Sequence, residues 1–143
     1  MLKNIVKELA EKYSTNSPYE IAACMSINVI TWGLHEEIRG YYKYDRRNRY
    51  IVINGNLPQE MQRVVCAHEL GHAILHTRYN TPFMRQNTFL SVSKIEIQAN
   101  IFAAELLISD DSLRECESLT IEHIAALHHV PAELVKLKCK GLF

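Results

Sequence analysis

The feature that most constrains this chain is the stretch VVCAHELGHAILH at residues 64–76, which is apolar around the whole helix yet carries titratable side chains in its middle. A helix that is apolar all round is buried, so the helix predicted over residues 57–76 belongs at the centre of the fold. His68, Glu69 and His72 are buried with it, and a buried carboxylate needs a partner to offset its loss of water. The sequence therefore demands a partner for these three side chains.

The spacing along this helix favours a divalent metal ion as the partner. His68 and His72 are four residues apart and lie on one helix face, so they can direct two ring nitrogens at one point. Glu69 lies one step round the helix, where it can reach a water held in an open coordination position. The pattern H-E-x-x-H thus supplies two zinc ligands and a general base for hydrolysis. The pattern also arises by chance, with hydrogen-bonded histidines and a solvated glutamate, but the apolar setting favours the metal.

Catalytic zinc usually has three protein ligands, and Glu96 in KIEIQANIFAAELL is the candidate for the third. Small residues on its predicted helix, residues 93–109, allow a close approach to the metal helix, which is the helix predicted over residues 57–76. Asn100 lies one turn later, where it can hydrogen-bond a ligand histidine. A second interpretation stays open, because Ser93-x-x-Glu96 also fits a capping box that would turn the carboxylate toward the backbone.

Other polar side chains receive weaker assignments. His76 lies eight residues from His68, about 12 Å along the helix, too far to bind the same ion, so we expect it behind a ligand histidine or in packing. Residues 77–92 form either a lid over the cleft or a packed connector, with Phe83, Met84, Phe89 and Leu90 as its apolar members. The donor that stabilises an oxyanion is left open among Tyr50, Tyr79, His123 and His128.

The rest of the chain predicts an α+β domain. Helices are expected over residues 2–13 and from Pro18 to about Met25, and Asn56 with Gln59 is expected to cap the metal helix. A strand at 27–32 and a hairpin at 38–45 and 49–54 predict a small three-stranded antiparallel sheet, followed by helices only. The 49–54 strand or its hairpin partner is expected to hold an extended substrate at its edge.

Composition places the chain in the cytoplasm. The four cysteines are scattered, which favours free thiols in a reducing compartment. No signal peptide or membrane-spanning stretch is expected. Sixteen basic and sixteen acidic residues cancel, so the net charge predicts no broad attraction to nucleic acid or to a membrane.

The whole chain, residues 1–143, is expected to form a single domain with a catalytic core at 1–110 and a helical tail at 111–143. The tail segment IEHIAALHHVPAELVKLK has helix-turn-helix spacing. Glu133 on its second helix and His129 in place of a turn glycine argue against direct DNA binding. We expect the tail to pack on the core or to contact a protein partner.

Two paired motifs resemble those of the ImmA/IrrE-type zinc metallopeptidases. They are HELGHAILH and the later E-x-x-A-N-x-F-A-A-x-L-L, which begins at Glu96, and the similarity covers about residues 15–110. The resemblance implies a minimal zincin fold, akin to the thermolysin catalytic core, with a metal helix and a glutamate-ligand helix. It implies His68, His72 and Glu96 as zinc ligands and Glu69 as general base. Gln98 stands where many members have glutamate, and we expect little effect from it.

The same resemblance implies a partner and a biological role. Members of the family typically come from prophages, mobile elements or stress regulons and cleave or inactivate a helix-turn-helix transcriptional repressor. The implied function is that of a zinc metallo-endopeptidase, with manganese as an alternative ion, acting as an anti-repressor in transcription regulation. Two other functions stay open: a module that binds the repressor without cutting it, as in an anti-repressor or toxin–antitoxin pair, and a DNA-binding regulator with a structural zinc.

Overall fold

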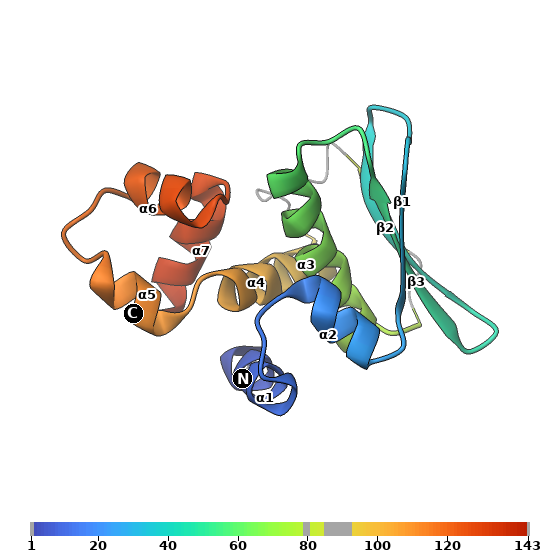
Figure 1. The fold of residues 1–143 in the computed structure, drawn as a ribbon, viewed down its shortest axis with the longest axis horizontal. Helices are drawn as coiled ribbons and strands as arrows, with labels where there is room; N and C mark the ends of the chain where they lie inside the picture. Colours follow the sequence, from blue (N-terminus) through green and yellow to red (C-terminus); the bar gives the residue numbers. More distant parts are fainter. Residues whose placement is uncertain (1, 79–80, 85–92, 143) are drawn as a thin grey trace.

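The structure is a computed structural model that describes residues 2–78, 81–84 and 93–142. In Figure 1 the sheet forms one side of the molecule, α2 and α3 lie against it, and α4 leads away from α3 to the last three helices. The elements are α1 (Leu2–Tyr13), α2 (Pro18–Cys24), β1 (Asn28–Trp32), β2 (Ile38–Asp45), β3 (Asn48–Asn54), α3 (Gln59–Leu75), β4 (Thr81–Met84), α4 (Lys94–Leu107), α5 (Asp110–Glu115), α6 (Ile121–His128) and α7 (Ala132–Leu142).

The α+β class is confirmed, but the sheet differs from the three antiparallel strands expected from the sequence. It has four strands in the order β1-β3-β2-β4, and β1 runs parallel to β3. The connection after β1 passes over the end of β3, so that β3 lies between β1 and β2. Asn54 holds this connection, because its side-chain amide donates to the carbonyl oxygen of Ile38 at 2.8 Å and its oxygen accepts from the backbone of Leu34 at 3.2 Å.

Two expectations about strands are wrong. A fourth strand, β4, follows the metal helix, which was expected to be followed by helices only, and pairs with β2. Phe83 and Met84 belong to it, whereas Tyr79, Phe89 and Leu90 lie outside the described residues. The hairpin strands also cannot offer a substrate-binding edge, since β3 pairs with β1 and β2, and β2 pairs with β3 and β4. Among the described strands, the edges are β1 and β4.

The expected cap of the metal helix is also wrong. α3 begins at Gln59 after Pro58, whose position makes no side-chain cap hydrogen bond. Asn56 instead donates to the backbone oxygen of Leu34 at 3.4 Å, across the β1–β2 connection. Asn56 makes this long-range contact instead of a helix cap because the β1–β2 connection lies directly beside the end of β3. Gln62, in the first turn of the helix, donates to the Leu57 carbonyl oxygen at 2.8 Å.

α3 lies between the sheet and α4, and glycine allows close packing on both sides. A Cβ atom at Gly40 of β2 would lie 2.7 Å from Cγ1 of Val65, closer than packed atoms allow. A Cβ atom at Gly71 of α3 would lie 3.1 Å from the Cβ of Phe102 in α4. Both neighbours, Val65 and Phe102, are fully buried. The metal helix is therefore held at a fixed, short distance from α4.

A buried ion-pair cluster attaches the last helices to this core. Lys138 of α7 is 2% exposed, and its Nζ lies 2.6 Å from Oε2 of Glu105 and 2.5 Å from Oδ1 of Asp110. Lys3 of α1 contacts the other oxygen of Asp110 at 2.8 Å. The face of α7 that carries Lys138 packs against α4. The second helix of the helix-turn-helix-like pair is thus committed to packing, which agrees with the argument against DNA binding.

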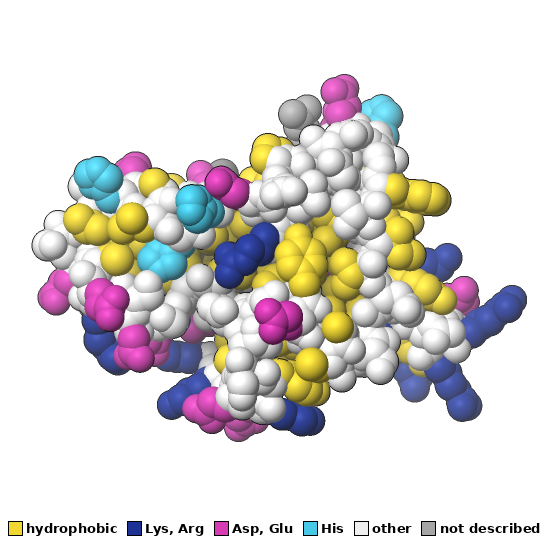
Figure 2. Space-filling model, in the orientation of Figure 1, with side chains coloured by type: hydrophobic (Ala, Val, Ile, Leu, Met, Phe, Trp, Pro, Cys, Tyr) yellow, Lys and Arg dark blue, Asp and Glu magenta, His cyan; other side chains and the backbone are white. Residues whose placement is uncertain are grey.

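The surface carries both signs of charge, and Lys and Arg side chains gather where the β2–β3 hairpin projects (Figure 2). Both turn residues of that hairpin, Arg46 and Arg47, have positive φ angles of 50° and 69°. This conformation matches the twist of a two-residue hairpin turn. Among the described residues, no helix combines the length and the apolar character that crossing a membrane requires.

Candidate metal centre

Two histidine rings of α3 and one carboxylate of α4 converge at the contact between these helices. His68 and His72 are fully buried, and Glu96 is 5% exposed. Nε2 of His68 lies 2.9 Å from Oε2 of Glu96, and Nε2 of His72 lies 3.1 Å from Oε1 of the same residue. These distances show that the carboxylate faces the histidines rather than the start of its own helix, where the Ser93 side chain makes no cap hydrogen bond. The structure therefore brings together the three side chains that the sequence proposed as ligands.

The donor set and its burial fit a divalent cation. His68, Glu69 and His72 can each offer one ligand atom within 4.8 Å of the others, and all three are buried. Both carboxylate oxygens of Glu69 have no hydrogen-bond partner among the described residues. Buried oxygens without a donor are costly, and a cation offsets this cost. Imidazole nitrogen with carboxylate oxygen is a ligand set that zinc accepts, and manganese also binds such oxygens.

The two carboxyl groups differ in their pKa values. Burial raises the pKa of Glu69 well above 4.5, and the nearby charge of Glu96 raises it further. Burial also raises the pKa of Glu96, but hydrogen bonds from His68 and His72 outweigh it, so that pKa falls to about 2. Burial lowers the pKa of His72, which favours the neutral ring that a metal requires. One carboxylate is thus fixed as an anion while the other readily holds a proton, a pattern typical of acid–base sites.

The ring nitrogens on the far side of both histidines also have partners. Nδ1 of His68 lies 2.7 Å from Oδ1 of Asn100, and Nδ1 of His72 lies 3.1 Å from Nδ1 of His76. These are the two residues that the sequence placed behind the ligands. The structure therefore brings together all six expected site residues: His68, Glu69, His72, His76, Glu96 and Asn100.

Gln98 is the residue that sequence reasoning undervalued. Its Oε1 lies 2.7 Å from Nε2 of His76, so it extends the line of contacts behind His72. A signal was available, since His76 continues the face of His68 and His72 and so had to meet the helix that carries Glu96. Which residue of that helix it meets depends on how far the two helices are offset, and spacing alone does not give that offset.

The residues considered for an oxyanion donor lie elsewhere or outside the described residues. Tyr50 neighbours Ile51, which is buried against the helices, so it points to the opposite face of the sheet. His128 of the tail contacts the Ile124 carbonyl oxygen and Ser112. His123 is on the same tail helix, and Tyr79 is not described. None of the three described candidates contacts the metal-site side chains.

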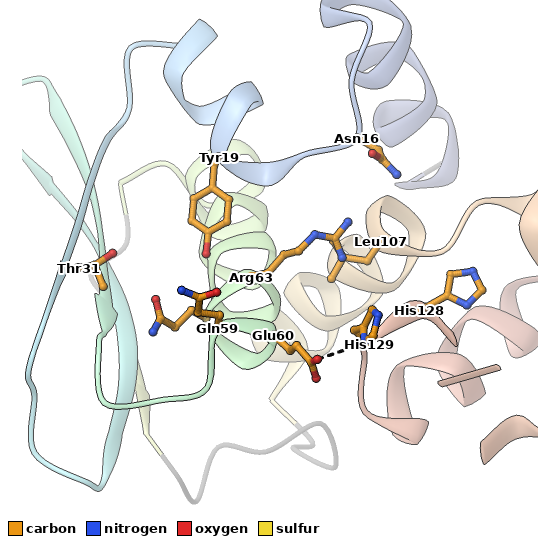
Figure 3. A pocket seen from close by; sticks show the side chains of 10 residues that line it. Asn16, Tyr19, Thr31, Gln59, Glu60, Arg63, Leu107, His128 and His129 are labelled. Atoms are coloured by element: carbon orange, nitrogen blue, oxygen red, sulfur yellow. Dashed lines mark ion pairs between the residues drawn. The ribbon is translucent and has the colours of Figure 1, made fainter. Parts of the chain in front are cut away.

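A separate cavity of about 760 Å³ opens between the first turns of α3 and the tail. Figure 3 shows Gln59, Glu60 and Arg63 of α3 on one side and His128 and His129 on the other. An ion pair of 3.1 Å between Glu60 and His129 crosses it. None of the metal-site side chains is among the residues that line this cavity, so it is distinct from the metal centre.

Comparison with known proteins agrees with this geometry. The family model of a peptidase family, described as the IrrE N-terminal-like domain, matches residues 22–140. "Uncharacterized immunity region protein 2" of Bacillus phage phi105 is 52% identical over 140 residues, which cover 96% of this chain and 89% of that protein. "Metallopeptidase ImmA" of Bacillus subtilis (strain 168) is 31% identical over 141 residues, covering 96% of this chain and 83% of that protein.

Proposed function

This chain belongs to the peptidase family of the IrrE N-terminal-like domain, and on that premise we propose that it is a zinc-dependent endopeptidase that inactivates a helix-turn-helix transcriptional repressor. The observation that carries the enzymatic part is the convergence of two buried histidines and a buried glutamate beside a second glutamate that has no hydrogen-bond partner among the described residues. Purely structural packing would not bury the Glu69 carboxylate beside these groups without a donor for its oxygens.

His68 and His72 would hold the metal through Nε2, and Glu96 through its carboxylate. Bound there, a divalent ion supplies Lewis acidity, which activates water and polarises a peptide carbonyl. Asn100 and His76 keep the two rings oriented from behind, as contacts at the far nitrogen do in metal sites generally. Zinc is the ion proposed, and manganese is the alternative that the same donors accept.

Glu69 would act as the general base and then as the general acid. It is fully buried, and its raised pKa suits a group that takes a proton from water and passes it to the leaving amine. Because both of its oxygens have no hydrogen-bond partner among the described residues, neither is committed to a structural contact there. The carboxylate is therefore free to serve the reaction.

The substrate class rests on the relatives. One relative is named as an immunity region protein of a phage and another as the metallopeptidase ImmA. We propose that this chain works in a similar setting, where it would cleave a repressor and so switch on phage or mobile-element genes inside the cytoplasm. The free cysteines fit a reducing compartment.

The test combines the purified protein, zinc and helix-turn-helix repressors encoded in the same genome, with mass spectrometry of the products. The wild-type protein is expected to cut the repressor. Glu69→Gln is expected to bind zinc and repressor but to leave the repressor intact. If Glu69→Gln relieves repression as fully as wild type, the protein acts by binding alone, and the peptidase proposal is wrong.

A further inference from the structure

A line of three side chains lies behind the metal-facing ring of His72 and ends at α4. Nδ1 of His72 lies 3.1 Å from Nδ1 of His76, and Nε2 of His76 lies 2.7 Å from Oε1 of Gln98. His76 and Gln98 are half-buried. Both rings are therefore connected through their two nitrogens, and the position of the proton on each ring is linked to the other.

A neutral imidazole carries one proton, so one nitrogen donates and the other offers a lone pair. His72 can give its Nε2 lone pair to a metal only when its proton is on Nδ1. That proton points to His76, whose Nδ1 must then accept it. His76 in turn carries its proton on Nε2 and donates it to Oε1 of Gln98. The carbonyl oxygen of Gln98 thus favours the positions of the two ring protons that leave Nε2 of His72 free to bind a metal.

The opposite arrangement arises if Gln98 presents its amide NH₂ group instead. Nε2 of His76 would then accept, and its Nδ1 would donate to His72. His72 would carry its proton on Nε2, toward Glu96, and could not bind a metal there. Both arrangements have the same net charge, so the choice depends on the hydrogen bonds at the two ends of the line. The carboxylate of Glu96, 3.1 Å from Nε2 of His72, favours a proton on that nitrogen when no metal is bound, whereas the carbonyl oxygen of Gln98 favours the proton on Nδ1.

We propose that Gln98 is a positioning residue that acts through His76 to hold His72 in the metal-binding tautomer. This inference rests on the proposed metal site and adds to it a residue that neither ligates metal nor touches substrate. His68 supports the same principle by a shorter route, because Oδ1 of Asn100 contacts its Nδ1 directly at 2.7 Å. Each metal-facing ring is thus oriented by a side-chain amide of α4, one directly and one through His76.

The first variant is Gln98→Met, which keeps the length of the side chain and removes the acceptor. Zinc affinity, measured by competition with a chelator, is expected to fall about 10- to 100-fold, the usual cost of losing a contact behind a ligand. The thermal unfolding of the metal-free variant is expected to match wild type. Gln59→Met, at the exposed start of α3, is the matched control and is expected to leave affinity unchanged.

A rescue variant separates this role from simple packing. Gln98→Glu retains an oxygen that can only accept, so zinc affinity is expected to be at least that of wild type. Ile97→Glu adds the same charge one residue away on an exposed position and controls for general attraction of the cation. If Gln98→Glu exceeds Ile97→Glu while Gln98→Met falls, hydrogen-bond direction is responsible. If Gln98→Met and Gln98→Glu lose affinity equally, the inference is wrong.

A double-mutant cycle tests whether Gln98 acts through His76. In a His76→Ala background, Gln98→Met is expected to cause no further loss of zinc affinity. Full additivity of the two losses, or wild-type affinity in Gln98→Met alone, would overturn the inference. If the wild-type protein binds no zinc, the proposed function fails first, so the two failures are distinguishable.

Discussion

Two clusters of charged side chains include residues of α4, and they differ in how the desolvation cost of their buried charges is offset. In the tail cluster, Lys138 contacts Glu105 and Asp110, and Lys3 contacts Asp110, so that two cations balance two carboxylates. In the metal centre, the Glu96 carboxylate contacts two histidine rings, but neither oxygen of Glu69 has a hydrogen-bond partner among the described residues. A cluster whose charges are all paired within the protein attaches one helix to another. A cluster with a buried carboxylate that has no partner is suited to bind a cation or a substrate.

The largest effect on stability is expected in the tail cluster. Lys138→Met leaves the buried carboxylate of Glu105 without its cation and leaves the half-buried Asp110 paired with Lys3 alone, so the free energy of unfolding is expected to fall by about 3–5 kcal/mol in denaturant titrations. Lys136→Met, on an exposed position of the same helix, is the control and is expected to have almost no effect. Equal stability of Lys138→Met and the control would show that the cluster contributes only packing.

In the metal centre the largest effect is expected on zinc binding rather than on folding. Glu96→Ala removes the only α4 carboxylate that faces both histidines among the described residues, so zinc affinity is expected to fall about 100-fold or more. Ser93→Ala is the control, because its side chain makes no cap hydrogen bond. Isothermal titration gives both values. Unchanged zinc stoichiometry and affinity in Glu96→Ala would exclude it as a ligand.

A smaller effect of opposite sign is expected at Glu69. Because its burial is not compensated in the metal-free protein, Glu69→Met is expected to raise the free energy of unfolding by about 1–3 kcal/mol at pH 8. Burial, with the charge of Glu96, raises the pKa of Glu69, so the gain is expected to shrink as the pH falls and the carboxyl group takes up a proton. Urea titrations at pH 8 and pH 5 measure both. A loss of stability would mean that Glu69 has a structural partner.

The smallest effect is the acid dependence of the tail cluster. Burial raises the pKa of Asp110, but hydrogen bonds from Lys138 and Lys3 outweigh it and lower the pKa from 3.8 to about 2. The stabilisation is therefore complete above pH 3.8 and is lost as the pH falls toward 2, about 1 kcal/mol after solvent screening. Asp110→Asn is expected to reduce the change in the free energy of unfolding between pH 4 and pH 2. Denaturant unfolding followed by circular dichroism measures this change. An unchanged slope would contradict this assignment.

The sequence predicted the convergence of the candidate metal-site side chains because the constraint is local. An all-apolar helix with His68, Glu69 and His72 has few ways to fold, and small residues around Glu96 favour close contact with it. Gln98 and Gly71 were harder to judge, since their roles depend on the offset between α3 and α4. The spacing of residues along one helix does not predict how far that helix is shifted relative to the other.

The sheet was predicted less well because its order depends on long-range contacts. The strand pattern identified β1, β2 and β3 as strands, but the parallel pairing of β1 with β3 requires a connection that passes over the end of β3. Asn54 stabilises that connection from within the next strand. The same connection draws Asn56 away from the helix that it was expected to cap.

The most direct test of the metal centre is anomalous diffraction at the zinc edge from crystals of the zinc-loaded protein. One anomalous peak is expected at about 2.0–2.2 Å from Nε2 of His68, Nε2 of His72 and a carboxylate oxygen of Glu96. A peak elsewhere, or these three side chains turned to different places around no metal, would contradict the account.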